Sequence, residues 1–109
     1  MLTRRYGRRS RLWRTRVPYR IDYTDEARRN LRRLPGYYRP PARRMIERLQ
    51  ADPRPPRAKE LRDAPGRYRL RLDEWRIIYR VNDDLQEIVI LAIRRKTGPE
   101  TYEDIENIA

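Results

Sequence analysis

Two stretches near the middle of the chain alternate apolar and charged side chains and are separated by only two residues. Tyr68 to Leu72 reads Tyr-Arg-Leu-Arg-Leu, and Trp75 to Val81 follows directly after Asp73-Glu74. Successive side chains of a β-strand point to opposite faces of a sheet, and a two-residue connection is the length of a hairpin turn. The pattern therefore predicts an antiparallel pair of strands with an apolar face and a charged face. The charged face of the first strand carries Arg67, Arg69 and Arg71.

Three further segments fit strands or turns. A third strand is predicted over residues 86–94, where Ile88 to Ile93 is apolar at every position, as is typical of a strand covered on both faces. Upstream, Tyr19 to Tyr23 alternates and predicts another strand. Residues 58–61 are interpreted as a short turn or strand end, and a weak helical pattern runs from Thr101 to Ile108.

Two helices are predicted between the first strand and the others. Thr24 or Asp25 can cap the first helix, which ends at the Pro-Gly pair 35–36, and the second helix starts near the paired prolines 40–41 and ends before residues 52–53. Their apolar stripes are Ala27, Leu31 and Leu34, then Ala42, Met45, Ile46 and Leu49. The order β-α-α-β-β-β predicts an α+β fold in which two helices pack on one face of a small, mainly antiparallel sheet. The other face, which carries the arginines, is expected to stay partly open.

Charge divides the chain into parts. The 28 Lys and Arg residues against 16 Asp and Glu give a net charge of +12. Residues 1–17 hold seven arginines and no acid. We expect them to form a disordered basic arm, which either binds RNA or is a translated stretch upstream of the true start. Residues 18–109 are expected to form one domain. A domain this basic attracts nucleic acid, an anionic membrane surface or an acidic protein.

The chain also lacks several kinds of chemistry. It contains no cysteine and no histidine, which removes a thiolate nucleophile, an imidazole base and the usual ligands of transition metals. No apolar run approaches the 18 residues of a membrane span, and the basic N-terminus lacks the apolar core of a signal peptide. We therefore expect a soluble cytoplasmic protein that uses no cofactor or metal.

The arginines at positions 67, 69 and 71, which we call the arginine row, have two interpretations. The row can be a solvated outer face of the sheet, or it can grip phosphate, which suits the planar guanidinium group. On the second interpretation Arg69 and Arg71 join Arg76 and Arg80 of the next strand, and basic residues 94–96 end the third strand. Such a cluster stabilises negative charge on a phosphoryl group. Without a metal or a histidine, strand scission would use the 2′-hydroxyl of RNA as nucleophile.

The combined pattern resembles the RelE/ParE toxin superfamily of bacterial type II toxin–antitoxin systems. The residues that carry the resemblance are Ala27-x-x-x-Leu31-x-x-Leu34-Pro35, Ile46-x-x-Leu49-x-x-Asp52-Pro53, Leu61, Tyr68 to Leu72, Trp75 to Val81, Ile88 to Ile93, Arg94-Arg95-Lys96 and Tyr102. The resemblance covers about residues 19–106 and implies a RelE-like fold. It also implies a cognate acidic antitoxin as partner, with operator DNA contacted only through the antitoxin complex, and no membrane.

The two branches of the superfamily imply different targets. RelE-like members enter the ribosomal A site and cleave mRNA without a metal, whereas ParE-like members poison DNA gyrase. The RelE-like pattern, which we favour, implies that Arg69 and Arg71 grip RNA and take part in proton transfer. It also implies that Arg76 stabilises the scissile phosphate and that Tyr102 stacks on the mRNA. Substrate-binding roles are expected for Arg67, Arg94, Arg95 and Lys96.

This chain departs from the RelE-like pattern in ways that keep other hypotheses open. Arginine is a poor base because its guanidinium stays protonated at neutral pH. Glu60 or Glu74 is only a weak replacement, and Gly98-Pro99 precedes Tyr102, which can equally be a core residue. The alternatives to a ribosome-dependent endoribonuclease are a gyrase inhibitor and a catalytically decayed module that binds RNA or the ribosome.

Overall fold

The computed structural model describes residues 18–105, so the predicted basic arm and the last residues of the predicted C-terminal helix lie outside the described residues. The elements in chain order are β1 (Arg20–Tyr23), α2 (Asp25–Arg33), α3 (Arg39–Arg48), β2 (Lys59–Glu60), β3 (Arg67–Leu72), β4 (Trp75–Asn82), β5 (Glu87–Arg95) and the 3-10 helix η1 (Pro99–Tyr102). Among residues 18–105, neither α-helix has the length and hydropathy that a membrane span requires.

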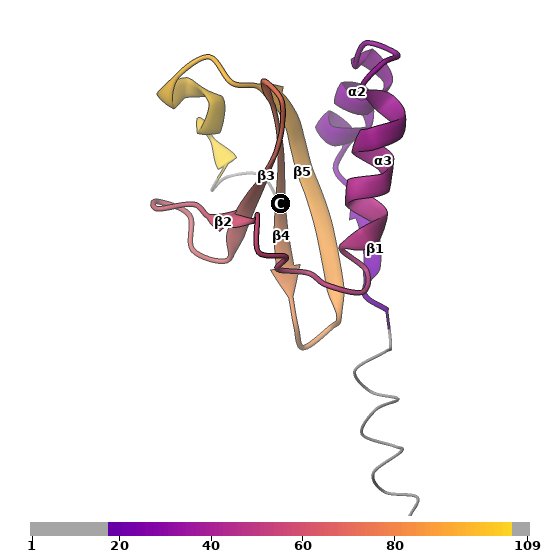
Figure 1. Cartoon of the computed structure of the whole chain (residues 1–109). Coiled ribbons are helices and arrows are strands. Elements are labelled where there is room, and N and C mark those ends of the chain that lie inside the picture. Colours follow the sequence, from indigo (N-terminus) through magenta and orange to yellow (C-terminus); the bar gives the residue numbers. More distant parts are fainter. Residues whose placement is uncertain (1–17, 106–109) are drawn as a thin grey trace, which may run out of the picture.

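The five strands form one sheet in the order β1-β5-β4-β3-β2. Neighbouring strands are antiparallel except β1 and β5, which run parallel. Both α-helices lie on one side of this sheet, and η1 and β2 lie toward the other side (Figure 1). The predicted α+β fold is confirmed, and β2 adds a short fifth strand that the sequence indicated only as a turn or strand end.

Local chemistry explains where the helices begin. The Oγ1 atom of Thr24 accepts a hydrogen bond from the backbone nitrogen of Ala27 at 3.0 Å and donates one to the Leu91 carbonyl at 2.7 Å. Thr24 is therefore the N-cap of α2 and also ties the start of that helix to β5. Helix α3 begins at Arg39 and has prolines in its first turn. Backbone N–H groups in the first turn make no hydrogen bond within the helix, so proline, which lacks this group, is tolerated there.

The sheet separates two apolar layers. Beneath the helices, the core contains Ala27, Leu34, Ala42, Ile46, Leu49, Leu70, Ile77, Tyr79, Ile88, Ile90 and Ile93. On the other face, Ile78, Val89, Leu91 and Ala92 pack with Ala64 and with Ile105, which is 1% exposed. Strand β5 is thus covered on both faces, as predicted. The C-terminal segment after β5 covers part of the sheet face away from the helices, which was expected to stay partly open.

Candidate functional site

Three arginines stand side by side across the middle strands on the face away from the helices. Arg71 of β3 is opposite Arg76 of β4, and Arg76 is in turn opposite Arg94 of β5. Side chains directly opposite each other on neighbouring strands lie about 5 Å apart at Cβ, and like charges in such positions repel. We call Arg71, Arg76 and Arg94 the arginine rung. An anion placed on the rung would offset this repulsion.

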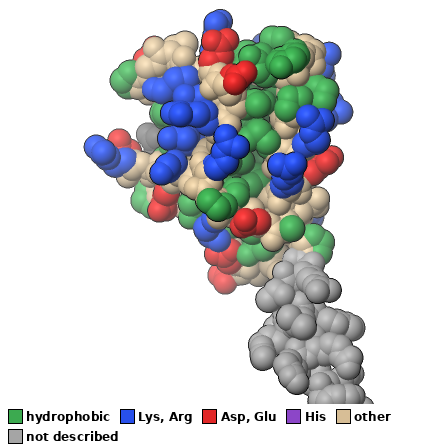
Figure 2. Space-filling view, in the orientation of Figure 1, with side chains coloured by type: hydrophobic (Ala, Val, Ile, Leu, Met, Phe, Trp, Pro, Cys, Tyr) green, Lys and Arg blue, Asp and Glu red, His purple; other side chains and the backbone are tan. Residues whose placement is uncertain are grey.

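A second line of basic residues crosses the rung along β3. Arg67, Arg69 and Arg71 alternate with apolar residues that face the helices, as the sequence predicted. Arg67 lies opposite Arg80 of β4, and Arg69 lies opposite Lys59 of β2. Lys and Arg side chains form a band on this side of the molecule, left of centre in Figure 2. Lys59 was not predicted, because a two-residue strand has no alternation to read.

Arg76 is the most enclosed member of the rung. Arg76 is only 7% exposed. Its Nη1 donates hydrogen bonds to the backbone oxygens of Asp73 at 2.8 Å and Trp75 at 2.9 Å. Both acceptors belong to the β3–β4 hairpin, where Asp73 has a positive φ of 52°. The hairpin therefore fixes one edge of this guanidinium before any ligand arrives. Fixed donors stabilise developing charge without the cost of reorganising.

A cleft of about 630 Å³ opens beside the arginine row, between β2 and the C-terminal segment. Arg69 and Lys59 border it on one side and Lys96 and Tyr102 on the other. The Nζ of Lys96 lies 5.8 Å from the centre of the Tyr102 ring. The fold thus brings together Arg69, Lys96 and Tyr102, three of the predicted site residues, although Gly98-Pro99 lies between the last two.

A β-bulge in β5 decides which of the neighbouring residues Arg94 and Arg95 shares the face of Arg76. The pairing of β4 with β5 shifts between Ile78 and Tyr79, so both Leu91 and Ala92 pack on the face away from the helices. Past the bulge, Arg94 shares the face of Arg76, whereas Arg95 lies opposite Trp75, which packs against the helix-side core. Arg95 instead pairs with Glu74 at 3.1 Å. Arg94 lies on the sheet face away from the helices, but its side chain is hydrogen-bonded to Glu26 and to the C-terminal segment.

The two carboxylates considered as bases occupy different places. Glu60 lines the cleft, and its Oε2 accepts a hydrogen bond from the backbone nitrogen of Gly66 at 2.9 Å. Glu74 sits in the β3–β4 hairpin and is paired with Arg95. Glu60 is therefore the better placed of the two. Among residues 18–105 no group of three or more Asp, Glu, His or Cys side chains is arranged to hold a metal ion.

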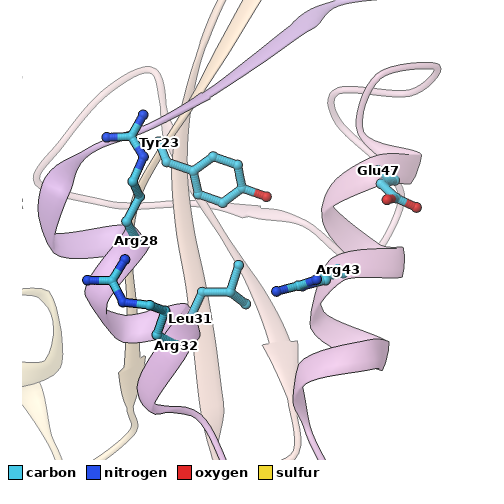
Figure 3. Close-up of a pocket in the computed structure, with 6 residues that line it drawn as sticks. All are labelled: Tyr23, Arg28, Leu31, Arg32, Arg43 and Glu47. Carbon is cyan, nitrogen blue, oxygen red and sulfur yellow. The ribbon is translucent and has the colours of Figure 1, made fainter.

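A separate pocket of about 360 Å³ lies between the helices. Figure 3 shows the ring of Tyr23 reaching from β1 between the two helices, with Arg28, Leu31 and Arg32 on α2 and with Arg43 and Glu47 on α3. Burial raises the pKa of the Tyr23 hydroxyl above its ordinary value. Three arginines and one carboxylate surround an apolar floor. The charges and the apolar floor complement a molecular surface that is acidic and partly apolar.

Comparison with known proteins gives consistent matches. The family model of the ParE toxin of the type II toxin–antitoxin system parDE matches residues 21–97. A chain of the RelBE2 toxin–antitoxin complex from Mycobacterium tuberculosis is 30% identical with a TM-score of 0.64, covering 72% of this chain and 99% of that chain. The E. coli toxin RelE in the free state, as a mutant, is 22% identical with a TM-score of 0.71, covering 84% and 99%. The archaeal RelE–RelB complex from Pyrococcus horikoshii is 25% identical with a TM-score of 0.63, covering 72% and 96%. No curated protein sequence matches.

Proposed function

Because the chain belongs to the RelE/ParE superfamily of type II toxins, with RelE toxins as its structural matches, we propose that it cleaves mRNA on the ribosome. The observation that carries this proposal is the arginine rung, with Arg76 held rigidly between Arg71 and Arg94. An enclosed arginine placed opposite two others is electrostatically unfavourable unless an anion lies nearby. A phosphate bound over Arg71 and Arg76 would relieve the repulsion.

The proposed reaction uses the RNA itself as nucleophile. The 2′-oxygen attacks the adjacent phosphorus, the bond from phosphorus to the 5′-oxygen breaks, and a 2′,3′-cyclic phosphate and a 5′-hydroxyl result. Arg76 and Arg71 stabilise the charge that builds on the phosphoryl oxygens. Arg67, Arg69 and Lys96 bind the flanking phosphates, and Tyr102 stacks on a base at the mouth of the cleft.

Proton transfer falls to a carboxylate in this proposal. The 2′-hydroxyl must lose a proton and the leaving 5′-oxygen must gain one. A guanidinium group is a poor base, so another side chain must accept the proton of the 2′-hydroxyl, and water supplies the proton that the leaving 5′-oxygen gains. Glu60 lines the cleft together with Arg69 and Tyr102, so we propose it as the group that accepts the proton.

The proposed partner is an acidic antitoxin. Solved relatives include toxin–antitoxin complexes, and the net charge of +12 favours an acidic protein. The pocket between α2 and α3 combines an apolar floor with Arg28, Arg32 and Arg43 and would accept an amphipathic segment of such a partner. Co-expression with the product of an adjacent small acidic open reading frame is expected to relieve growth arrest. Arrest that persists beside every adjacent gene product would contradict this partner.

Toeprinting on translating ribosomes tests the proposed reaction. The wild type is expected to cut mRNA in the A site, and Arg71→Ala is expected to lose most cleavage, because Arg71 is exposed and its removal leaves the core intact. Arg44→Ala, an equal change of charge on the exposed side of α3, is the matched control. The proposal is wrong if the wild type leaves A-site mRNA intact or if Arg71→Ala cuts as well as Arg44→Ala.

A second candidate function is inhibition of DNA gyrase. It is favoured by one observation, the match of residues 21–97 to the ParE toxin family model. Expression of the chain would then produce double-strand DNA breaks while mRNA stays intact. Measuring DNA breaks and mRNA cleavage in the same induced cells separates the two functions.

A further inference from the structure

We infer that Arg94 is a positioning residue, which fixes the segment that carries Tyr102 and does not itself bind RNA. Its Nη1 donates to the backbone oxygens of Thr101 at 3.0 Å and Glu103 at 2.9 Å. These two carbonyls are on either side of Tyr102 in the chain. One side chain thus holds the backbone before and after the tyrosine. The inference rests on the proposed function in so far as Tyr102 contacts the mRNA.

The other side of the same guanidinium is held by helix α2. Nε and Nη2 of Arg94 donate to the two carboxylate oxygens of Glu26 at 2.9 and 3.2 Å. The side chains of Arg94 and Glu26 are 22% and 32% exposed, so solvent screens this pair less than a surface pair. A bidentate pair of this kind is stronger and more directional than a single charged contact. Through Arg94, the first turn of α2 is linked to the C-terminal segment.

Glu26 also changes the charge of the arginine rung. Arg94 stands opposite Arg76, and without a counter-charge the two would repel. The carboxylate of Glu26 neutralises the end of the rung at β5, while Arg71 at the other end is exposed. The part of the rung left for a phosphate is therefore Arg71 and Arg76, next to the row on β3.

The rest of the segment is seated independently of Tyr102. Thr101 is 3% exposed, and its Oγ1 accepts hydrogen bonds from the backbone nitrogens of Thr97 at 2.9 Å and Gly98 at 3.3 Å. Ile105 is buried against the sheet on the far side of the tyrosine. Tyr102 itself stays partly exposed at the cleft. The ring of Tyr102 packs against the core cluster on this face, and the bonds from Arg94 hold the backbone on either side of the ring between these two anchors.

Amide hydrogen exchange tests the inference on the protein alone. In Glu26→Gln the amides of residues 101–105 are expected to exchange about tenfold faster, as the loss of one charge-assisted bond predicts. Asp25→Asn is the matched control, since it makes the same charge change one residue earlier, where the side chain is 88% exposed. Amides of β4 should not change in either variant. Equal exchange of residues 101–105 in the two variants would overturn the inference.

Arg94→Lys gives a second measurement. Lysine keeps the charge but cannot bind both the carboxylate and the two carbonyls in one planar fork. Residues 101–105 are expected to exchange faster in this variant as well, although the net charge of the chain is unchanged. Wild-type exchange in Arg94→Lys would mean that charge alone holds the segment, and the positioning role would be rejected.

Cleavage kinetics then connect Arg94 to Tyr102. Glu26→Gln is expected to lower kcat with little change in KM, and Tyr102→Ala added to it should cause no further loss, because the tyrosine is already misplaced. With Asp25→Asn as background, Tyr102→Ala should keep its full effect. Losses that simply add in the Glu26→Gln background would contradict positioning. A wild type without cleavage would reject the proposed function alone, because the exchange measurements decide on Arg94 independently.

Discussion

Asn30 of α2 accepts a hydrogen bond at its Oδ1 from the backbone nitrogen of Ile93 at a distance of 2.8 Å. Strand β1 pairs with β5 only as far as Ile90, so within residues 18–105 no strand lies beside the edge of β5 beyond that point. Thr24 bonds to the carbonyl of Leu91, and Asn30 to the nitrogen of Ile93. Beyond the end of β1, the side chains of Thr24 and Asn30 therefore hydrogen-bond to the backbone edge of β5 in place of a strand.

Replacing Asn30 by leucine is expected to destabilise the fold by about 1–3 kcal/mol, since the N–H of buried Ile93 loses its partner. Urea unfolding followed by circular dichroism measures the change. Arg29→Leu, at the exposed neighbouring position of the same helix, controls for helix propensity and should change stability by less than about 0.5 kcal/mol. Similar losses in both variants would show that the Asn30 side chain does not replace strand pairing.

Asp83 gives the fold a dependence on acid. Hydrogen bonds from Arg54 and then from Tyr19 hold the pKa of Asp83 below its ordinary value. A carboxyl whose pKa is lower when folded stabilises the fold above its unfolded pKa, and this contribution is lost as pH falls through the folded pKa. Wild type should therefore be more stable than Asp83→Asn at pH 7, and the difference should vanish toward pH 2. Urea unfolding at each pH measures the stability of both proteins. A stability difference that stays constant from pH 7 to pH 2 would contradict a lowered pKa of Asp83.

Tyr19 gives a matching effect in alkali. Its hydrogen bond to Asp83, 2.7 Å long, raises the pKa of the tyrosine hydroxyl above its ordinary value. A raised pKa contributes stability below pH 10 that is lost as pH rises through the folded value. The stability difference between wild type and Tyr19→Phe is expected to be constant between pH 6 and 9 and to shrink above pH 10. Thermal unfolding in that range measures it.

The arginine row predicts a salt dependence of RNA binding. The logarithm of the binding constant falls with the logarithm of salt concentration in proportion to the phosphates contacted. Arg69→Ala and Arg71→Ala should each reduce the slope by about one unit. Arg44→Ala removes the same charge from α3 and should leave the slope unchanged. Fluorescence anisotropy of a labelled single-stranded RNA between 50 and 300 mM salt (about a factor of six) is the measurement. An equal reduction in all three variants would indicate attraction by net charge only.

Tyr102 separates stacking from hydrogen bonding. If its ring stacks on a base, Tyr102→Phe should keep nearly full cleavage, whereas Tyr102→Ala should lose about 1–3 kcal/mol, which is roughly 5- to 150-fold. If the hydroxyl is the essential group, both variants lose activity alike. Initial cleavage rates on programmed ribosomes distinguish the two.

Much of the fold and part of the site could be predicted because apolar and charged residues alternate along the strands. This alternation indicates which face of the sheet each side chain occupies. The short hairpin after Leu72 already places Arg71 and Arg76 at the same end of two neighbouring strands. The position of Arg94 could not be predicted, since the apolar run from Ile88 to Ile93 contains no alternation and conceals the bulge at Leu91 and Ala92. That bulge decides that Arg94 and not Arg95 joins the rung. The pairing of Arg94 with Glu26, far away in sequence, depends on the tertiary fold alone.

The parallel pairing of β1 with β5 has a consequence for the time at which the toxin becomes active. Ile21 is paired with Ile88, so the first strand cannot find its neighbour until the ribosome has also made the helices and the three strands that lie between them in sequence. Contacts between such distant residues also slow folding, because a long loop must close before they form. At a synthesis rate of about 5–20 residues per second, most of the chain emerges over several seconds while the sheet is still incomplete. The order of the strands therefore gives each newly made molecule a built-in delay.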